Sequence, residues 1–320
     1  MNRIHHSLGL AAGLIVTALF VWYVIRTLHG HDLSVYATPR AALGIALASL
    51  LWSCGAPLLA QAWRELLNSL GAHRSWRELF GIIGITQFAK YVPGNVAQYI
   101  GRVGMSLARG IPARPLAVTI ILETLLVIAS AMVMGVGTGA LSEIGLQVVR
   151  RHGAQLALIV LLVVSAIAGL FVFRRVAPVL LKRFAPKYAP VLDGTLLPSQ
   201  ICLARVFVLY CCMYACMGIG LIVLAHFLLP GTLHDYWLLI AVFALAWVVG
   251  FVTPGAPGGL GVRESLMLLM LAPAFSTASA SVLVIALRVA TTLGDVLILI
   301  AGFLLLPKRH DVPSTTPARS

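Results

Sequence analysis

The sequence has little charge for its length. Of its 320 residues only 10% are charged and 60% are hydrophobic, and the mean hydropathy is +0.98. Soluble domains carry about 25% charged residues, so this composition excludes a soluble globular protein. It predicts an all-α polytopic membrane protein. No polar stretch is long enough for a separate soluble domain, so we predict one transmembrane domain over 1–306, followed by a disordered cytoplasmic tail over 307–320.

Features of enzymes and metalloproteins are also missing from the sequence. No Ser-His-Asp order, phosphate-binding loop, dinucleotide fingerprint or metal-ligand spacing occurs. The five cysteines lie in or beside apolar runs, where cysteine behaves as a small hydrophobic residue. We therefore predict that the protein is not an enzyme and binds no metal and no cofactor.

Acidic residues are scarce, and the formal net charge is +13. Such an excess can indicate nucleic-acid binding, but here Lys and Arg fall between apolar runs, which is typical of residues that orient a membrane protein. Basic residues follow the second, fourth and last predicted helices, whereas the connection "PGTLHDY" over 230–236 has none. The positive-inside rule therefore predicts a protein of the cytoplasmic membrane with both termini in the cytoplasm. Arg150 and Arg151 are exceptions to this pattern.

Long apolar runs predict six spanning helices, at 8–28, 41–63, 114–140, 154–173, 201–229 and 277–306. Two further apolar segments, 79–108 and 236–272, are interrupted by Pro and Gly. Proline breaks the hydrogen-bond ladder of a helix, and each half is too short to span comfortably, so we predict two re-entrant helical hairpins. The alternative for the second segment is that 236–253 spans by itself. The breaking residues are Pro93 and Gly94 in the first segment and Pro254, Gly255, Pro257, Gly258, Gly259 and Gly261 in the second.

The two hairpins occupy corresponding places in the chain. Each follows two predicted spanning helices and precedes one, and the two Pro-Gly breaks are 161 positions apart (254 − 93). With the predicted orientation the first hairpin enters from the cytoplasm and the second from outside. This pattern predicts an inverted-topology repeat of about 1–140 and 150–306, joined by a basic interfacial stretch over 174–187.

Polar and ionisable residues gather in the hairpins and in the helices that follow them. Such groups are costly at membrane depth and usually face a polar interior. Half-helices that begin after each break would add the positive ends of their dipoles, which favour an anion. We therefore predict a substrate site that consists of Lys90, Tyr91, Asn95, Gln98, Arg102, Glu123, Arg263, Glu264, Arg288 and Asp295.

Several structural roles compete with this interpretation. Arg288 and Asp295 share a helix face and could form an ion pair, or Arg288 could pair with Glu123 instead. Arg102 and Arg263 could extend towards lipid head groups. The sequence leaves these alternatives open. For Tyr210 and Tyr214, at helical spacing, we expect a packing role.

The stretches "FAKYVPGNVAQYIGR" and "TPGAPGGLGVRES" resemble the two signature regions of the lysylphosphatidylglycerol synthase transmembrane-region family of flippase-like proteins. The first pattern corresponds to Lys90, Tyr91, Pro93, Gly94, Gly101 and Arg102, and the second to Pro257, Gly258, Gly259, Gly261, Arg263 and Glu264. The late-helix Arg of the family falls on Arg288 and its membrane Glu on Glu123. This sequence departs from the pattern at Thr124, where an Arg often follows that Glu.

The resemblance implies movement of lipids between membrane leaflets, with an anionic or lipid-linked amphipathic substrate as the partner. Because the sequence ends soon after its last predicted helix, we expect no synthesis of lysyl-lipid by this chain alone. The alternative is a non-transporting membrane subunit that supports a glycosyltransferase or another lipid-modifying enzyme.

Overall fold

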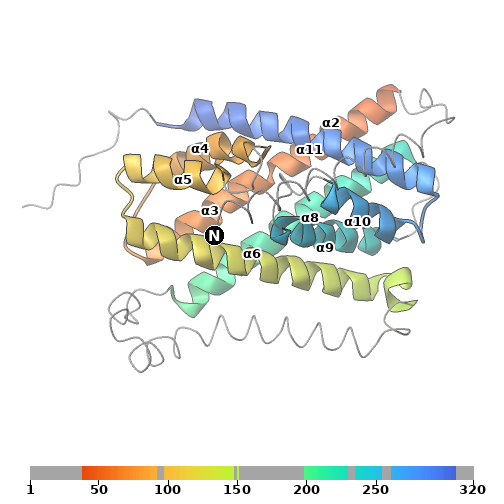
Figure 1. Cartoon of the computed structure of the whole chain (residues 1–320), viewed down its shortest axis with the longest axis horizontal. Helices are drawn as coiled ribbons and strands as arrows, with labels where there is room; N and C mark the ends of the chain where they lie inside the picture. The colour runs from red at the N-terminus through yellow and green to blue at the C-terminus, as the bar shows by residue number, and fades with distance from the viewer. Residues whose placement is uncertain are drawn as a thin grey trace, which may run out of the picture.

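The computed structural model describes residues 38–91, 97–147, 150, 198–229, 235–253 and 261–307. Every regular element within these ranges is a helix (Figure 1). The predicted spanning helices 8–28 and 154–173, the basic stretch 174–187 and the tail beyond 307 lie outside the described residues. The same holds for all the breaking residues except Gly261.

Four described helical segments are long and apolar enough to cross a membrane, namely Pro39–Ser69, Ala113–Leu141, Gln200–Leu228 and Thr277–Leu305. The last three are α6, α8 and α11, and they confirm the predicted helices 114–140, 201–229 and 277–306 within one residue at each end. The first extends beyond the predicted 41–63 and comprises α2 (Pro39–Ser53) and α3 (Gly55–Ser69). Its start is fixed locally, since the Thr38 side chain accepts a hydrogen bond from the Ala41 N–H.

In both interrupted segments the described helices end before the Pro-Gly pair and begin again after it. In the first, α4 (Trp76–Gln87) runs into a 3₁₀ turn, η2 (Phe88–Tyr91), and α5 (Ala97–Ala108) follows. In the second, α9 (Tyr236–Val252) precedes α10 (Val262–Leu271). The helices of each pair pack against one another, which favours a hairpin over a lone spanning α9. The α4–α5 pair and the α9–α10 pair lie towards opposite ends of the molecule (Figure 1).

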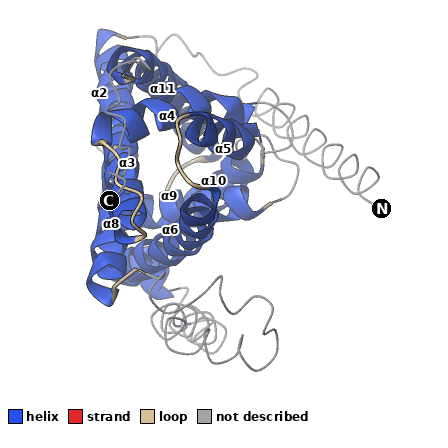
Figure 2. Ribbon diagram, turned by 90° about the vertical axis from the view of Figure 1, so that its left-hand side faces the viewer, coloured by secondary structure: helices blue, strands red, loops and turns tan. Residues whose placement is uncertain are grey.

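Each hairpin is held by the long helix that follows the other hairpin. Helix α11 packs against α4, and α6 packs against α9. Helices α2, α3 and α8 contact each other and form one wall, while α6 and α11 lie at its two edges (Figure 2). The α4–α11 crossing is close, because a Cβ atom at Gly84 would lie 2.7 Å from the Ile298 carbonyl oxygen and 2.9 Å from the Gly302 Cα.

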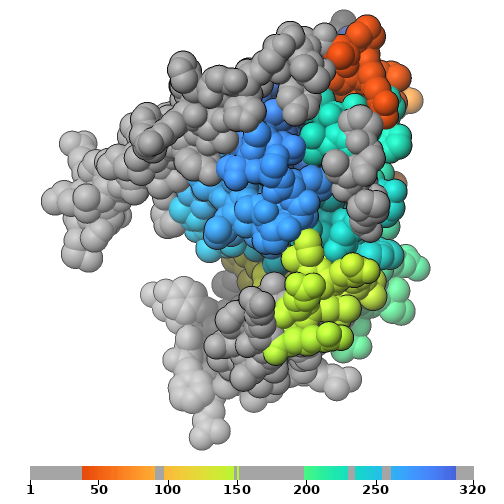
Figure 3. All heavy atoms as spheres, turned by 90° about the vertical axis from the view of Figure 1, so that its right-hand side faces the viewer, coloured from red at the N-terminus to blue at the C-terminus, as the bar shows by residue number. Residues whose placement is uncertain are grey.

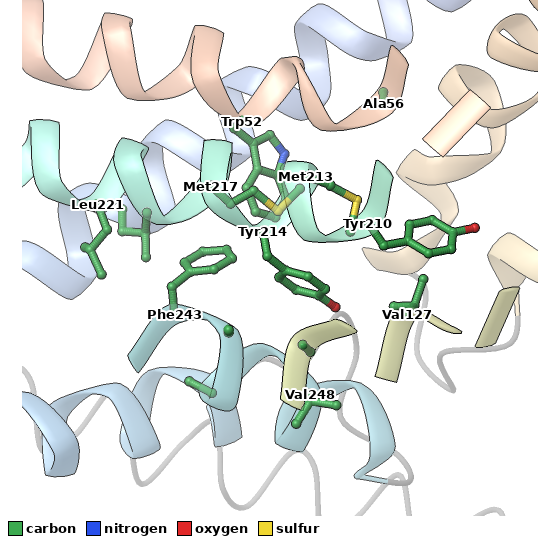
Figure 4. Packing of buried hydrophobic residues seen from close by; sticks show 14 of the residues in the cluster. Trp52, Ala56, Val127, Tyr210, Met213, Tyr214, Met217, Leu221, Phe243 and Val248 are labelled. Carbon is green, nitrogen blue, oxygen red and sulfur yellow. The ribbon is translucent and has the colours of Figure 1, made fainter. Parts of the chain in front are cut away.

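Aromatic residues fill the core between this wall and the second hairpin. The ring of Trp52 meets that of Phe243 edge-on, with 6.1 Å between centroids and 71° between planes. Tyr210 and Tyr214 are fully buried on α8 within the same cluster (Figure 4). The packing role expected for these two tyrosines is therefore confirmed.

Long-range hydrogen bonds tie the helices together at both ends of the molecule. At one end, Arg109 Nη2 at the end of α5 donates to the Pro307 carbonyl oxygen beyond α11 at 3.1 Å. At the other, Arg40 Nη2 of α2 donates to the His226 carbonyl oxygen of α8 at 3.2 Å. Figure 3 looks onto this second end, where the start of α11 and the end of α6 are exposed.

Candidate functional site

A cavity of about 130 Å³ lies between the two hairpins and the long helices. Its walls come from α2, α3, α4, η2, α5, α6, α8, α9, α10 and α11, so residues from both halves of the chain meet in it. Seven of the ten residues predicted for the substrate site line this cavity, namely Lys90, Gln98, Arg102, Glu123, Arg263, Arg288 and Asp295.

The first buried ion pair lies within the first half of the chain. Arg102 of α5 donates to both carboxylate oxygens of Glu123 on α6, with both distances at 2.6 Å. The Arg102 guanidinium also lies over the Trp63 ring, 3.7 Å from its centroid. A bidentate pair of this kind is strong and geometrically fixed. Arg102 is only 5% exposed, and we conclude that it holds α5 against α6.

The second buried ion pair joins the two halves. Lys90 Nζ of η2 lies 2.8 Å from both carboxylate oxygens of Asp295 on α11. Trp52 of α2 donates its indole N–H to Asp295 Oδ1 at 2.9 Å, and Lys90 Nζ lies 5.2 Å from the centroid of the Trp52 ring. The close approach of Trp52 depends on Gly294, where a Cβ atom would lie 2.5 Å from Trp52 Cδ1. Three helical elements thus converge on one carboxylate.

The carboxylate of Glu264 on α10 interacts with two arginines. Its Oε1 lies 3.1 Å from Arg263 Nη2 and 3.5 Å from Arg288 Nη1 on α11. Its Oε2 accepts the backbone N–H of Gly261 at 2.8 Å and so caps the start of α10. The sequence predicted that this helix start would be open to an anionic substrate. In the structure the Glu264 carboxylate already occupies it.

These pairings correct the alternatives that the sequence left open. Arg288 pairs with Glu264 rather than with Asp295 or Glu123. Asp295 pairs with Lys90, and Glu123 pairs with Arg102. The alternative in which Arg102 and Arg263 extend to lipid head groups is wrong, because both are only 5% exposed. Both guanidinium groups instead bind carboxylates in the interior, that of Glu123 for Arg102 and that of Glu264 for Arg263.

The structure leaves three of the predicted residues outside the cavity lining or outside its description. Glu264 is 2% exposed and acts on the cavity through Arg263 and Arg288. Tyr91 ends η2, and its side chain lies outside the described residues, as does all of Asn95. Gly261, at the start of α10, has a φ of +79°, a conformation that favours glycine.

Sequence reasoning missed the apolar wall of the cavity and several of its hydrogen-bond donors, Trp52 among them. The apolar wall includes Met213 and Met217 of α8 and Trp247 and Phe251 of α9. In the sequence these residues resemble any lipid-facing positions of an apolar helix, so no local signal marks them. Trp52 was missed too, although an indole N–H in a membrane helix needs an acceptor when it is buried.

The folded chain is an α-helical polytopic membrane protein with charged side chains buried in its interior. It belongs to the lysylphosphatidylglycerol synthase TM region family, whose sequence pattern matches residues 10–302. The family resemblance noted from the two motifs is therefore confirmed. No curated protein sequence matches the chain.

Proposed function

We propose that this protein moves an amphipathic lipid with an anionic group between the leaflets of the cytoplasmic membrane. The observation that carries the proposal is the lining of the cavity, which has a cationic part and an apolar part. Cationic side chains from both halves line it together with an apolar wall of methionine and aromatic residues. A lipid head group with the start of its chains matches such a surface, and membership of the family supports the same function.

An inverted repeat would provide the alternating access that transport requires. Support comes from the exchange of partners, since α11 packs against α4 and α6 packs against α9. The two hairpins also lie towards opposite ends of the molecule (Figure 1). We propose that residues 1–140 and 150–306 are the two repeats of one transmembrane domain over 1–306, and that both termini are cytoplasmic. Rocking of one repeat against the other would expose the cavity to each leaflet in turn.

The chemistry of the site requires no covalent step. Arg263 and Arg288 would compensate the charge of the head group in an interior of low dielectric, while the acyl chains remain in lipid. Glu123, Glu264 and Asp295 compensate the cations when the cavity is empty of substrate. We therefore assign a transport function rather than catalysis to this chain, with membrane lipids as its partners.

The test is lipid movement in proteoliposomes that contain the purified full chain. Lipids carry a fluorescent label on the head group, and a membrane-impermeant reductant bleaches those in the outer leaflet, with and without a pH gradient. We expect protein-dependent loss of protection for at least one anionic lipid. Arg263→Gln and Arg288→Gln should slow it about tenfold or more, because each removes a charge next to the anion.

The matched control is Arg205→Gln, which removes the same charge from an exposed position on α8 outside the cavity lining. This variant should transport at the wild-type rate. Wild-type rates in correctly inserted Arg263→Gln and Arg288→Gln proteins would contradict the assignment of the site. Protection that stays complete for every anionic lipid offered would contradict the transport function.

A further inference from the structure

Two tyrosines of α8 carry hydroxyl groups that packing does not explain. Tyr210 and Tyr214 are both 0% exposed, and the hydroxyl oxygen of each is buried without a hydrogen-bond partner among the described residues. A phenylalanine ring would fill the same space, and a buried tyrosine hydroxyl usually has a hydrogen-bond partner. Because a buried polar group without a hydrogen bond destabilises the fold, these hydroxyls indicate a further binding partner.

The two hydroxyls reach a region next to the ion pair of α5 and α6. Tyr210 interacts electrostatically with Glu123, Arg102 and Tyr214. Residues four positions apart lie on the same face of a helix. In Figure 4 both tyrosine rings accordingly extend from α8 towards the side on which Val127 of α6 lies. The two hydroxyls therefore lie between α8 and the Arg102–Glu123 pair.

The ion pair contributes a third polar group without a partner. Arg102 donates from Nη1 and Nη2 to Glu123, whereas its Nε atom is buried without a hydrogen-bond partner among the described residues. Arginine nitrogens can only donate, whereas a tyrosine hydroxyl both donates and accepts. Water complements all three groups, because it can accept from Nε and form a hydrogen bond with either hydroxyl.

The cavity gives water access to this region. Arg102 and Glu123 line the cavity, and so does Trp247, whose ring meets that of Tyr214 edge-on with 5.4 Å between centroids. The cavity measures about 130 Å³, whereas a bound water needs roughly 10–15 Å³. A buried water also needs roughly 2–4 polar partners. The two hydroxyls and Arg102 Nε meet this requirement.

We propose that Tyr210, Tyr214 and Arg102 Nε form an internal water site, and that ordered water in this site links α8 to α5. The charges of Arg102 and Glu123 cancel in their one-to-one pair, so the site selects a small neutral molecule. The two tyrosines are positioning residues, which hold the Arg102 guanidinium against Glu123 through the water. The site does not depend on the transport function proposed above, because it belongs to the folded chain without a lipid.

Hydroxyl-radical footprinting of the purified full chain in detergent tests for bound water. Radicals formed from ordered water oxidise the side chains next to it, and mass spectrometry locates the added oxygen. Tyr210 and Tyr214 should be oxidised at least about fivefold faster than Phe243, which is equally buried in the same cluster but carries no polar group. Oxidation of the tyrosines no faster than that of Phe243 would overturn the water site.

Removal of each hydroxyl gives results of opposite sign for a hydrated and an unpaired group. If water binds the hydroxyls, Tyr210→Phe and Tyr214→Phe lose hydrogen bonds and should lower Tm by a few degrees. If the hydroxyls have no partner, the same variants remove an unsatisfied buried group, and the resulting rise in Tm would overturn the proposal. The matched control is Tyr236→Phe at an exposed position on α9, which should leave Tm unchanged.

A cycle of variants tests whether Arg102 Nε shares the water. Arg102→Lys keeps the positive charge near Glu123 but removes the Nε donor, so Tyr210→Phe should lower Tm less in this background than in the wild type. Equal losses in both backgrounds would overturn the link to Arg102. A lower Tm of the tyrosine variants without fast oxidation would place their partner elsewhere in the chain and overturn the water site. If Arg102→Lys does not fold, footprinting and the tyrosine variants still decide the proposal.

Discussion

At the scale of single residues, the buried charges of this protein have two kinds of role. Arg102 pairs with Glu123 and Lys90 pairs with Asp295, whereas Arg263 and Arg288 share the carboxylate of Glu264. Arg102 and Lys90 are compensated within separate pairs, whereas Arg263 and Arg288 both lie against the same carboxylate. Residue type alone does not separate these roles, because three of the four cations are arginines. Arg102 and Arg263 lie on hairpin helices, and Arg288 lies on α11.

The first prediction concerns the Arg102–Glu123 pair. Arg102→Gln leaves the Glu123 carboxylate buried without its bidentate partner, so we expect the free energy of unfolding to fall by about 3–5 kcal/mol. The double variant Arg102→Gln/Glu123→Gln removes both charges and should recover most of the loss. Thermal unfolding of the purified proteins in detergent measures both effects.

The same variants show whether Arg102 contacts the ligand. The double variant should bind an anionic lipid such as phosphatidylglycerol with nearly wild-type affinity, because we propose that the charge of the head group meets Arg263 and Arg288 instead. A stable double variant whose affinity falls tenfold would instead place Arg102 in contact with the phosphodiester, as the sequence suggested.

At the scale of elements, the short helices of the hairpins position the charged groups. Helix α10 carries Arg263 and Glu264 in its first turn, and the start of the helix is fixed by the hydrogen bond from the Gly261 N–H to Glu264. Gly261 itself has a φ of +79°. A small change in backbone direction at this residue would therefore move both charged side chains relative to Arg288.

The second prediction compares Gly261 with Gly71, which has nearly the same φ of +78° in the connection between α3 and α4. Alanine at either position should cost roughly 1–2 kcal/mol of stability, since a Cβ atom is unfavourable in the left-handed region. Only Gly261→Ala should also weaken phosphatidylglycerol binding. Gly71 has open space around its Cβ direction and lies outside the cavity lining, so Gly71→Ala controls for strain alone.

The prediction is contradicted if Gly261→Ala and Gly71→Ala behave alike. If both variants lose stability equally and bind phosphatidylglycerol equally well, the conformation at Gly261 does not position Arg263 and Glu264 for lipid binding. Thermal unfolding and the Tm rise with ligand are measured on the same samples, so the two effects separate.

At the scale of the whole molecule, each half of the chain holds the hairpin of the other half. The Lys90–Asp295 pair adds an ionic link between the halves at the cavity itself. Movement of one half against the other must therefore change the environment of the charged groups. The charged cavity and the arrangement of the two halves are therefore coupled, as the proposed alternating access requires.

The third prediction is the orientation of the molecule. A fluorescent protein that folds only in the cytoplasm should fluoresce when it is fused to either terminus, because the basic residues retain these ends inside. Alkaline phosphatase, which is active only outside, should be active when it is inserted after Thr232, in the connection without Lys or Arg. Phosphatase activity from a C-terminal fusion would contradict the predicted orientation and the proposed inverted repeat.

The sequence by itself determined the helical fold, the positions of the described spanning helices and the two interruptions. These features are local, because the length of an apolar run and the effect of Pro and Gly on a helix need no distant partner. It also predicted many of the polar residues that line the cavity, since a polar side chain within an apolar run is costly unless it faces a polar interior. Seven of the ten predicted residues line the cavity for that reason.

Only the tertiary structure decided which charges pair and what closes the cavity. Lys90 and Asp295 are 205 positions apart, and no spacing rule connects them. Arg288 and Asp295 share a helix face, yet each pairs with a residue of another element, Arg288 with Glu264 and Asp295 with Lys90. The apolar wall from α8 and α9 could not be predicted either. An apolar residue in a sequence gives no sign of whether its side chain faces lipid or a cavity. Pairing and enclosure depend on which helices become neighbours, and packing decides this.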